Sequence, residues 1–157
     1  TCALPICAAM SEVAIRDLPT RDDVVRLQEV MFQLPQVTLE TKHYFADGMY
    51  CREVARPAGC TIVGKVHLKE HFYVICSGTV TVIGDGYRET ITGPRVIVSK
   101  PGTKRAVHAH TDAVCITIHR TDKTDLDEIE LELVESDTKA LFDSRNELIT
   151  DRLENTQ

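Results

Sequence analysis

Two of the six histidines stand four residues apart, in the segment 64–78 with the sequence GKVHLKEHFYVICSG. His67 and His71 flank a short polar break, and the residues after His71 are aromatic and β-branched, which is typical of a strand. Neutral imidazole is a common protein ligand for zinc, iron, nickel and copper. If Lys69 and Glu70 lie near a turn between two strands, both imidazoles converge, and the segment predicts part of a metal site.

A second pair, His108 and His110, has the spacing of alternate residues in a strand, which point to the same side. This spacing predicts that both imidazoles share one face. The non-functional interpretations are an exposed polar turn for the first pair and a solvent-facing strand edge for the second. His43 and His119 have no histidine partner nearby in the sequence, and we expect structural roles for both.

The elements that must position these side chains lie between about residues 37 and 119. Short β-rich runs alternate there with turns that contain glycine or proline, for example Gly84-Asp85-Gly86 and Pro101-Gly102. Runs of this length with such turns predict a sandwich or barrel, and helix-length periodic segments are missing between them.

Helices are expected on both sides of this β-rich region. Thr20 can cap a helix whose apolar residues keep helical spacing up to Leu34, and Pro35 is expected to end it. Acidic residues and apolar spacing predict another helix over 124–134, and a further one is expected over about 136–148.

We therefore divide the chain into an N-terminal helical segment (10–36), a β-barrel (37–120) and a C-terminal helical segment (121–157). The first residues, TCALPI, resemble a translated sequencing adapter of the kind found in metagenomic assemblies. We expect residues 1–9 to be non-native, Met10 to be the natural start, and the body to fold without them.

Composition limits the classes of function. The chain has 157 residues, 43% of them hydrophobic, which suits one domain with a real core. A net charge of −6 argues against nucleic-acid binding by phosphate neutralisation. We expect neither a membrane span nor a secretory signal, because no apolar run approaches the length of a span and the first residues lack a basic region followed by a long apolar one. The cysteines outside the first segment lack the CxxC spacing of a zinc site, so we expect free thiols and a cytoplasmic location.

At the first histidine pair the sequence resembles the cupin superfamily of RmlC-like double-sheet jelly rolls. The first cupin motif places HxH and then a glutamate ahead of a glycine. Counting back from Gly78, His71 occupies the glutamate position, His67 the second histidine position and Lys65 the first. The resemblance implies an all-β cupin-type double-stranded β-helix (jelly-roll barrel) with short helices at both ends, over about residues 48–119.

The second cupin motif, PxG followed by a histidine, is matched by Pro101-Gly102 with Arg105 at the histidine position. The patterns GKxHxxxH and PGTKRxxxAH are also similar to small single-domain cupins of tailed phages, which implies a host-cytoplasm location. Since Lys65 and Arg105 cannot bind a cation, a third imidazole must replace them. His110, and after it His108, is the candidate if a bulge turns the strand.

Three functional hypotheses follow from the resemblance. The first is a metal-dependent enzyme in which His67, His71, His110 and His108 hold zinc, iron, nickel or manganese. The second is a metal-free module in which Arg105 and Lys65, with Tyr73 on the same strand face as His71, bind an anionic small molecule. The third is a non-enzymatic phage structural or accessory protein, since a fold alone implies no function.

A homodimer is also expected. The run from His71 to Cys76 is apolar on both faces, so one face can line the barrel while the other must be covered by a helix or a second subunit.

Overall fold

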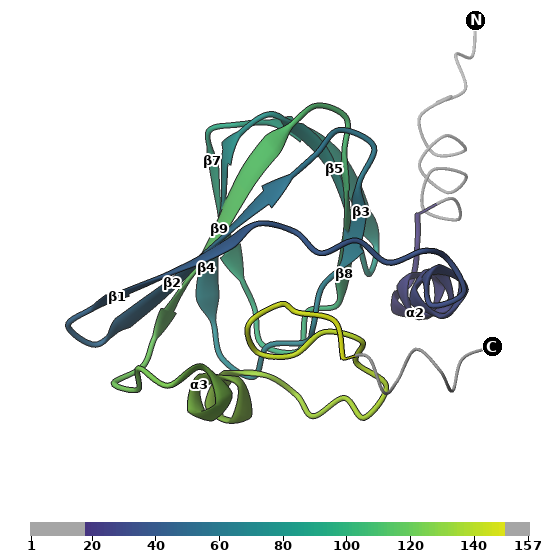
Figure 1. Cartoon of the computed structure of the whole chain (residues 1–157). Helices are drawn as coiled ribbons and strands as arrows, with labels where there is room; N and C mark the ends of the chain where they lie inside the picture. The colour runs from purple at the N-terminus through teal and green to yellow at the C-terminus, as the bar shows by residue number, and fades with distance from the viewer. Residues whose placement is uncertain (1–17, 150–157) are drawn as a thin grey trace, which may run out of the picture.

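The computed structural model describes residues 18–149, which form two antiparallel β-sheets with a helix on each side of them in the sequence (Figure 1). The elements are α2 (Arg21–Met31), β1 (Thr41–Ala46), β2 (Met49–Arg56), β3 (Thr61–Val63), β4 (His71–Ser77), β5 (Thr79–Gly84), β6 (Tyr87–Thr92), β7 (Arg95–Ser99), β8 (Arg105–Ala109), β9 (Ala113–Arg120) and α3 (Leu126–Leu133). The predicted adapter-derived segment 1–9 lies outside the described residues.

The strands are arranged as a double-sheet jelly roll. One sheet has the order β1-β2-β9-β4-β7 and the other the order β3-β8-β5-β6, and neighbouring strands pair antiparallel. Side chains that alternate along the strands fill the space between the sheets, including Tyr73, Ile75, Val82, Val107 and Cys115. The prediction of an all-β double-sheet barrel with flanking short helices is confirmed.

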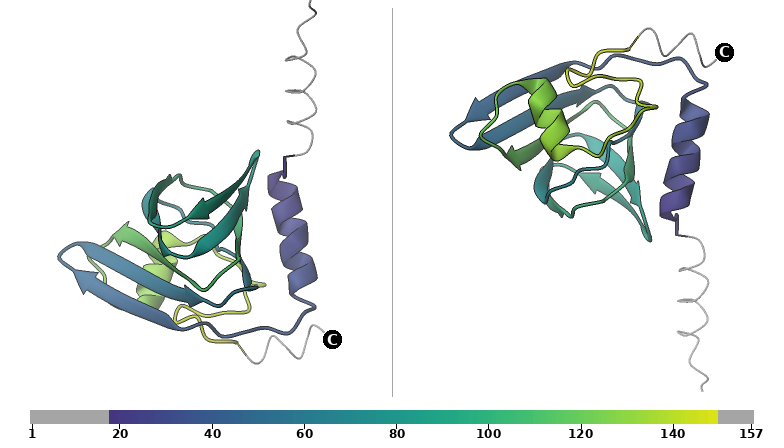
Figure 2. Two further views of the ribbon diagram at one scale, coloured as in Figure 1. Left: turned by 90° about the horizontal axis from the view of Figure 1, so that it is seen from above. Right: turned by 90° about the horizontal axis from the view of Figure 1, so that it is seen from below.

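Helix α2 begins where the sequence predicts it, because the Thr20 side chain accepts from the backbone N–H of Asp23 while the Asp23 carboxylate accepts from the Thr20 N–H. The α-helix ends at Met31, earlier than expected, and turns with hydrogen bonds from Gln33 to Val30 and from Leu34 to Met31 continue the chain as far as Pro35. The helix lies against the four-stranded sheet with Val24 buried (Figure 2), and the Arg21 guanidinium donates to the Gly102 carbonyl at 2.6 Å.

The predicted helix over 124–134 is confirmed as α3, which is capped by the Asp125 carboxylate. The helix expected over 136–148 is wrong. The Asp137 and Asp143 carboxylates accept backbone N–H groups two residues further on, and such Asx turns compete with helical hydrogen bonds. This stretch forms turns and an isolated bridge between Phe142 and Leu148.

α3 and the segment that follows it close one end of the barrel (Figure 1). The N–H of Leu68 donates to the Leu133 carbonyl at 2.8 Å, and the N–H of Glu135 donates to the Val66 carbonyl at 2.9 Å. These bonds attach the C-terminal segment to the residues immediately before β4. Within the described part of the chain, no helix is long and apolar enough to cross a membrane.

Candidate metal site and the barrel interior

Three histidines converge at the closed end of the barrel: His67, His71 and His119. Their ring centroids lie 4.3 Å apart for His67 and His71, 4.8 Å for His67 and His119, and 4.4 Å for His71 and His119. One potential ligand atom from each residue lies within 4.8 Å of the others. Within residues 18–149, no other group of three His, Cys, Asp or Glu side chains has the geometry to hold a metal ion.

The register of two neighbouring strands brings these residues together. His71 begins β4 and His119 lies near the end of β9, one step beyond the paired residues Phe72 and Ile118. Both imidazoles therefore point to the inner face of the same sheet. His67 precedes β4 and forms an isolated bridge with Val134, which holds it between the barrel and the segment that closes it.

The environment keeps these imidazoles neutral. Burial, followed by the neighbouring His71 and His119, lowers the pKa of His67 to about 2. Burial, followed by His71 and Arg52, lowers the pKa of His119 to about 3, and burial also lowers the pKa of His71. A neutral imidazole keeps the nitrogen lone pair that a metal ion requires.

Hydrogen bonding leaves ligand atoms available. The Lys69 carbonyl lies 3.1 Å from Nδ1 of His71, and because a carbonyl can only accept, Nδ1 carries the proton and Nε2 keeps its lone pair. Nδ1 of His119 is buried without a partner. The nitrogens of a tetrahedral zinc site lie about 3.3 Å apart, so a small contraction of this group would complete three ligand bonds. The donor set therefore fits a divalent metal ion.

The structure brings the predicted ligands His67 and His71 together, but it replaces His110 and His108 with His119. Val107 and Ala109 belong to the core, so the alternate residues His108 and His110 point to the outer face of the four-stranded sheet. The register from Arg105 to Ala109 against β5 is continuous, so the bulge needed to turn His110 inward is absent from this stretch. Their rings instead bond to threonine hydroxyls, His108 to Thr61 at 2.8 Å and His110 to Thr81 at 2.7 Å.

The predicted ligand-binding residues also separate into two places. Lys65 forms an ion pair with Glu130 of α3 at 2.5 Å and donates to the Phe142 carbonyl at 3.0 Å, so its charge is already matched at the closed end. Arg105 and Tyr73 face the interior between the sheets, with the guanidinium carbon of Arg105 at 5.1 Å from the centroid of the Tyr73 ring. The prediction that Lys65 and Arg105 hold one anion together is therefore wrong, because Lys65 is paired with Glu130.

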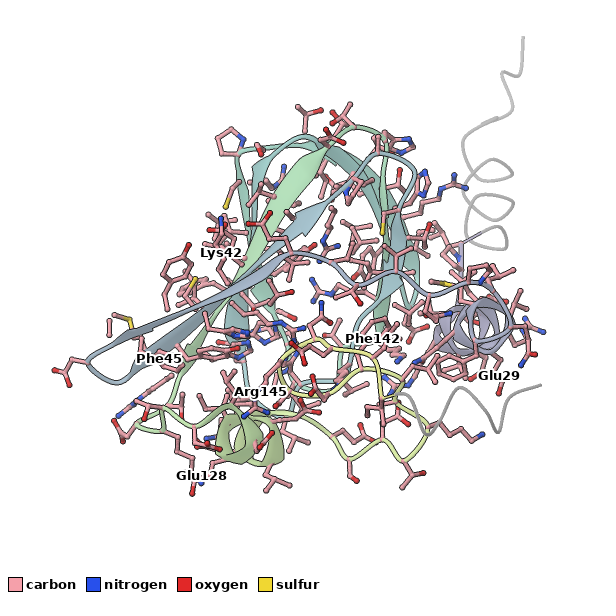
Figure 3. The ribbon with its side chains drawn as sticks, in the orientation of Figure 1. Glu29, Lys42, Phe45, Glu128, Phe142 and Arg145 are labelled. Atoms are coloured by element: carbon pink, nitrogen blue, oxygen red, sulfur yellow. The ribbon has the colours of Figure 1, made fainter. Side chains whose placement is uncertain are left out.

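Two further arginines enter the interior from β2. Arg52 is paired in register with Thr117, and Arg56 with Ala113, which belongs to the core. The guanidinium carbon of Arg56 lies 5.9 Å from the centroid of the Tyr73 ring. Figure 3 shows nitrogen-bearing side chains in the space between the two sheets. The sequence analysis missed both arginines, although Arg52, Val54 and Arg56 alternate along a strand.

A cavity of about 200 Å³ opens beside Arg105. Its wall is formed by residues of β5, β6, β7 and β8, including apolar side chains from Val82, Ile91 and Ile97. The charge of Arg105 contributes to lowering the pKa of both His67 and His71. Because Arg105 lines the cavity, a molecule held there would lie beside a positively charged residue.

Comparison with known proteins identifies the fold. No protein-family profile and no curated protein matches the chain. A salicylate 1,2-dioxygenase from Pseudaminobacter salicylatoxidans matches with a TM-score of 0.50 and 12% identity, over 72% of this chain and 35% of the dioxygenase. An RmlC-like cupin from Shewanella frigidimarina matches with a TM-score of 0.48 and 16% identity, over 56% of this chain and 80% of that protein.

A cupin 2 conserved barrel protein from Salinispora arenicola is also similar, with a TM-score of 0.46 and 14% identity, over 76% of its own chain and 54% of this one. At 12% identity the likeness to the dioxygenase is one of fold. Together with the strand order of the two sheets, it identifies the fold as an all-β jelly roll of the cupin type.

Proposed function

We propose that this cupin-fold chain binds one divalent metal ion through His67, His71 and His119. The proposal is supported mainly by the convergence of three imidazoles, of which His71 and His119 are buried and His67 is half-buried, and whose lowered pKa values keep them neutral at physiological pH. Imidazole ligands favour zinc, iron and nickel, whereas manganese prefers carboxylates, and the histidine group contains none. Zinc, iron and nickel are therefore the preferred ions among those that the sequence suggested.

Three protein ligands leave at least one coordination position open, which is the arrangement of catalytic rather than structural sites. A divalent ion there would supply a Lewis acid to a small molecule at the open position. The chain itself contributes the orientation of His71 through the Lys69 carbonyl and the exclusion of water by α3 and the segment after it. We therefore propose a metal-dependent enzyme that acts on a small molecule held in the barrel.

Metal analysis tests this proposal. We expect tag-free protein, reloaded in turn with zinc, iron, nickel and manganese, to retain close to one equivalent of at least one ion. His67→Ala and His119→Ala should each lose most of that ion. His108→Ala is the matched control, because its imidazole faces the outside of the other sheet, and it should retain the metal.

Less than a tenth of an equivalent in the parent would refute the metal site. Loss of metal from His108→Ala, with retention in His119→Ala, would show that the ligand set of the original sequence prediction is the correct one. Circular dichroism of each variant separates loss of metal from loss of fold.

We also propose that the outer face of the five-stranded sheet pairs with a second copy of the chain. Large apolar side chains from neighbouring strands are half-exposed on this face, with Phe72 at 50%, Val98 at 50% and Val96 at 60%. Helix α2 contacts the other sheet and cannot cover them. A contiguous apolar face of this kind is unusual on a monomer, and two-fold pairing is the commonest way to bury it.

We propose a cytoplasmic location because the cysteines of the described residues are not joined in disulfides. All four in the described residues, Cys51, Cys60, Cys76 and Cys115, are free thiols. Free thiols suit a reducing compartment.

A further inference from the structure

Three guanidinium groups share the interior between the sheets: those of Arg52, Arg56 and Arg105. Arg52 and Arg56 come from the inner face of β2, and Arg105 comes from the inner face of β8 on the opposite sheet. Arg56 is only 9% exposed. The sequence thus places several positive charges where a jelly roll normally packs apolar side chains.

These charges lack anionic partners within residues 18–149. None of the eight ion pairs in that range includes Arg52, Arg56 or Arg105. Nε and Nη1 of Arg56 and Nε of Arg52 are buried without a hydrogen-bond acceptor, and Arg105 donates to the neutral hydroxyl of Ser99.

The two carboxylates whose charges act on Arg52, those of Glu130 and Asp143, are hydrogen-bonded to other groups. The Glu130 carboxylate accepts from Lys65, and the Asp143 carboxylate accepts the backbone N–H groups of Arg145 and Glu147. Burying a guanidinium without an anionic partner is energetically costly, so this group of arginines favours the binding of an anion.

Tyr73 lies beside two of these three arginines. The guanidinium carbons of Arg56 and Arg105 lie 5.9 and 5.1 Å from the centroid of its ring. Its hydroxyl is buried without a hydrogen-bond partner. A phenol is a neutral donor that can point at a bound anion, and cation–π contact with the ring stabilises both guanidinium groups beside it.

We infer that the barrel interior binds a small organic carboxylate, held through its anionic group by Arg56, Arg105 and the Tyr73 hydroxyl, with Arg52 adding positive charge. A guanidinium fork matches a carboxylate in a bidentate geometry. Of the residues in this set, Arg105 lines the cavity of about 200 Å³. The wall of the cavity also contains the ion-paired Glu89 and Arg95 and the apolar side chains of Val82, Ile91 and Ile97, and these apolar side chains suit a short apolar body attached to the carboxylate. This inference goes beyond the metal proposal and does not depend on it.

The test uses isothermal titration calorimetry and thermal unfolding of the whole chain in EDTA, so that its outcome is separate from that of the metal measurement. The probes are benzoate and butyrate as carboxylates with an apolar body, benzamide as the uncharged analogue of benzoate, and inorganic phosphate as an anion without an apolar body. We expect at least one carboxylate to raise the melting temperature, because a ligand that binds only the native state stabilises it. Benzamide and phosphate should bind more weakly.

Substitutions identify the residues responsible. Arg56→Gln and Arg105→Gln should each weaken carboxylate binding by about ten- to a hundredfold, the loss of a charge-assisted hydrogen bond. Arg88→Gln is the matched control: Arg88 is an exposed arginine of β6 that does not line the cavity, so affinity should stay within about twofold.

The fold of the variants is checked by the melting temperature without ligand. Removal of an unpaired buried charge should leave it unchanged or raise it in Arg56→Gln. Absence of binding by both carboxylates, equal binding of benzamide, tighter binding of phosphate, or full affinity in both Arg56→Gln and Arg105→Gln would overturn the inference.

Discussion

His119 makes folding stability depend on pH in a way that can be calculated. Its side chain is 3% exposed, and burial, followed by the charges of His71 and Arg52, lowers its pKa to about 3. In the unfolded chain a histidine has a pKa of about 6.5. Because the folded pKa is the lower one, the unfolded state binds the proton first, and the contribution of His119 to stability is complete above pH 6.5 and is lost as the pH falls.

The magnitude follows from these two pKa values. At pH 5 almost every unfolded chain is protonated at this residue while the folded chain is not, which lowers the free energy of unfolding by about 2 kcal/mol relative to pH 8. His119→Phe removes the titration and keeps a flat ring between His71 and Tyr50, whose centroids lie 4.4 and 6.2 Å from that of His119. Since Nδ1 of His119 has no partner, that nitrogen loses no hydrogen bond in the substitution.

Urea unfolding followed by circular dichroism, in EDTA at several values between pH 8 and pH 5, measures this effect. We expect His119→Phe to be close to the parent at pH 8 and more stable than the parent by about 2 kcal/mol at pH 5. Ile75→Val is the control, because it changes a fully buried side chain that does not titrate, and its cost should be the same at both values.

An equal loss of stability in the parent and in His119→Phe between pH 8 and pH 5 would refute the reasoning. It would mean that the imidazole takes up a proton in the folded protein as readily as in the unfolded one. The description of His119 as an enclosed, neutral imidazole at the end of the barrel would then be wrong.

Two other predictions concern the frame of the barrel. Gly78→Ala should destabilise the fold by at least about 3 kcal/mol. The reason is that Gly78 has a φ of 83° and an added Cβ would lie 2.3 Å from the Asp112 carbonyl oxygen. A change below about 1 kcal/mol in urea unfolding would contradict this close approach. Phe72→Glu, on the outer face of the five-stranded sheet, should convert a dimer into a monomer in sedimentation at micromolar concentration, and a parent chain that is already monomeric would refute the proposed pairing.

Much of the strand pattern and part of the candidate site could be predicted from the sequence alone. Turn residues and β-branched runs predicted the double-sheet barrel, and the position of Gly78 indicated the relation between His67 and His71. The outward direction of His108 and His110 was also readable, because Val107 and Ala109 alternate with them and must face the core. That alternation outweighs the presence of two imidazoles, since a bulge would have moved apolar side chains to solvent.

Only the tertiary structure decided which distant side chains meet. His119 joins His71 because β9 pairs with β4 in one particular register, and Arg52 and Arg56 lie in the barrel because β2 pairs with the other edge of β9. These pairings are set by hydrogen bonds between residues at least 37 positions apart, so no local pattern specifies them. A charged residue on an inner face also contradicts the pattern expected of a core, and its position becomes evident only when the opposite sheet is in place.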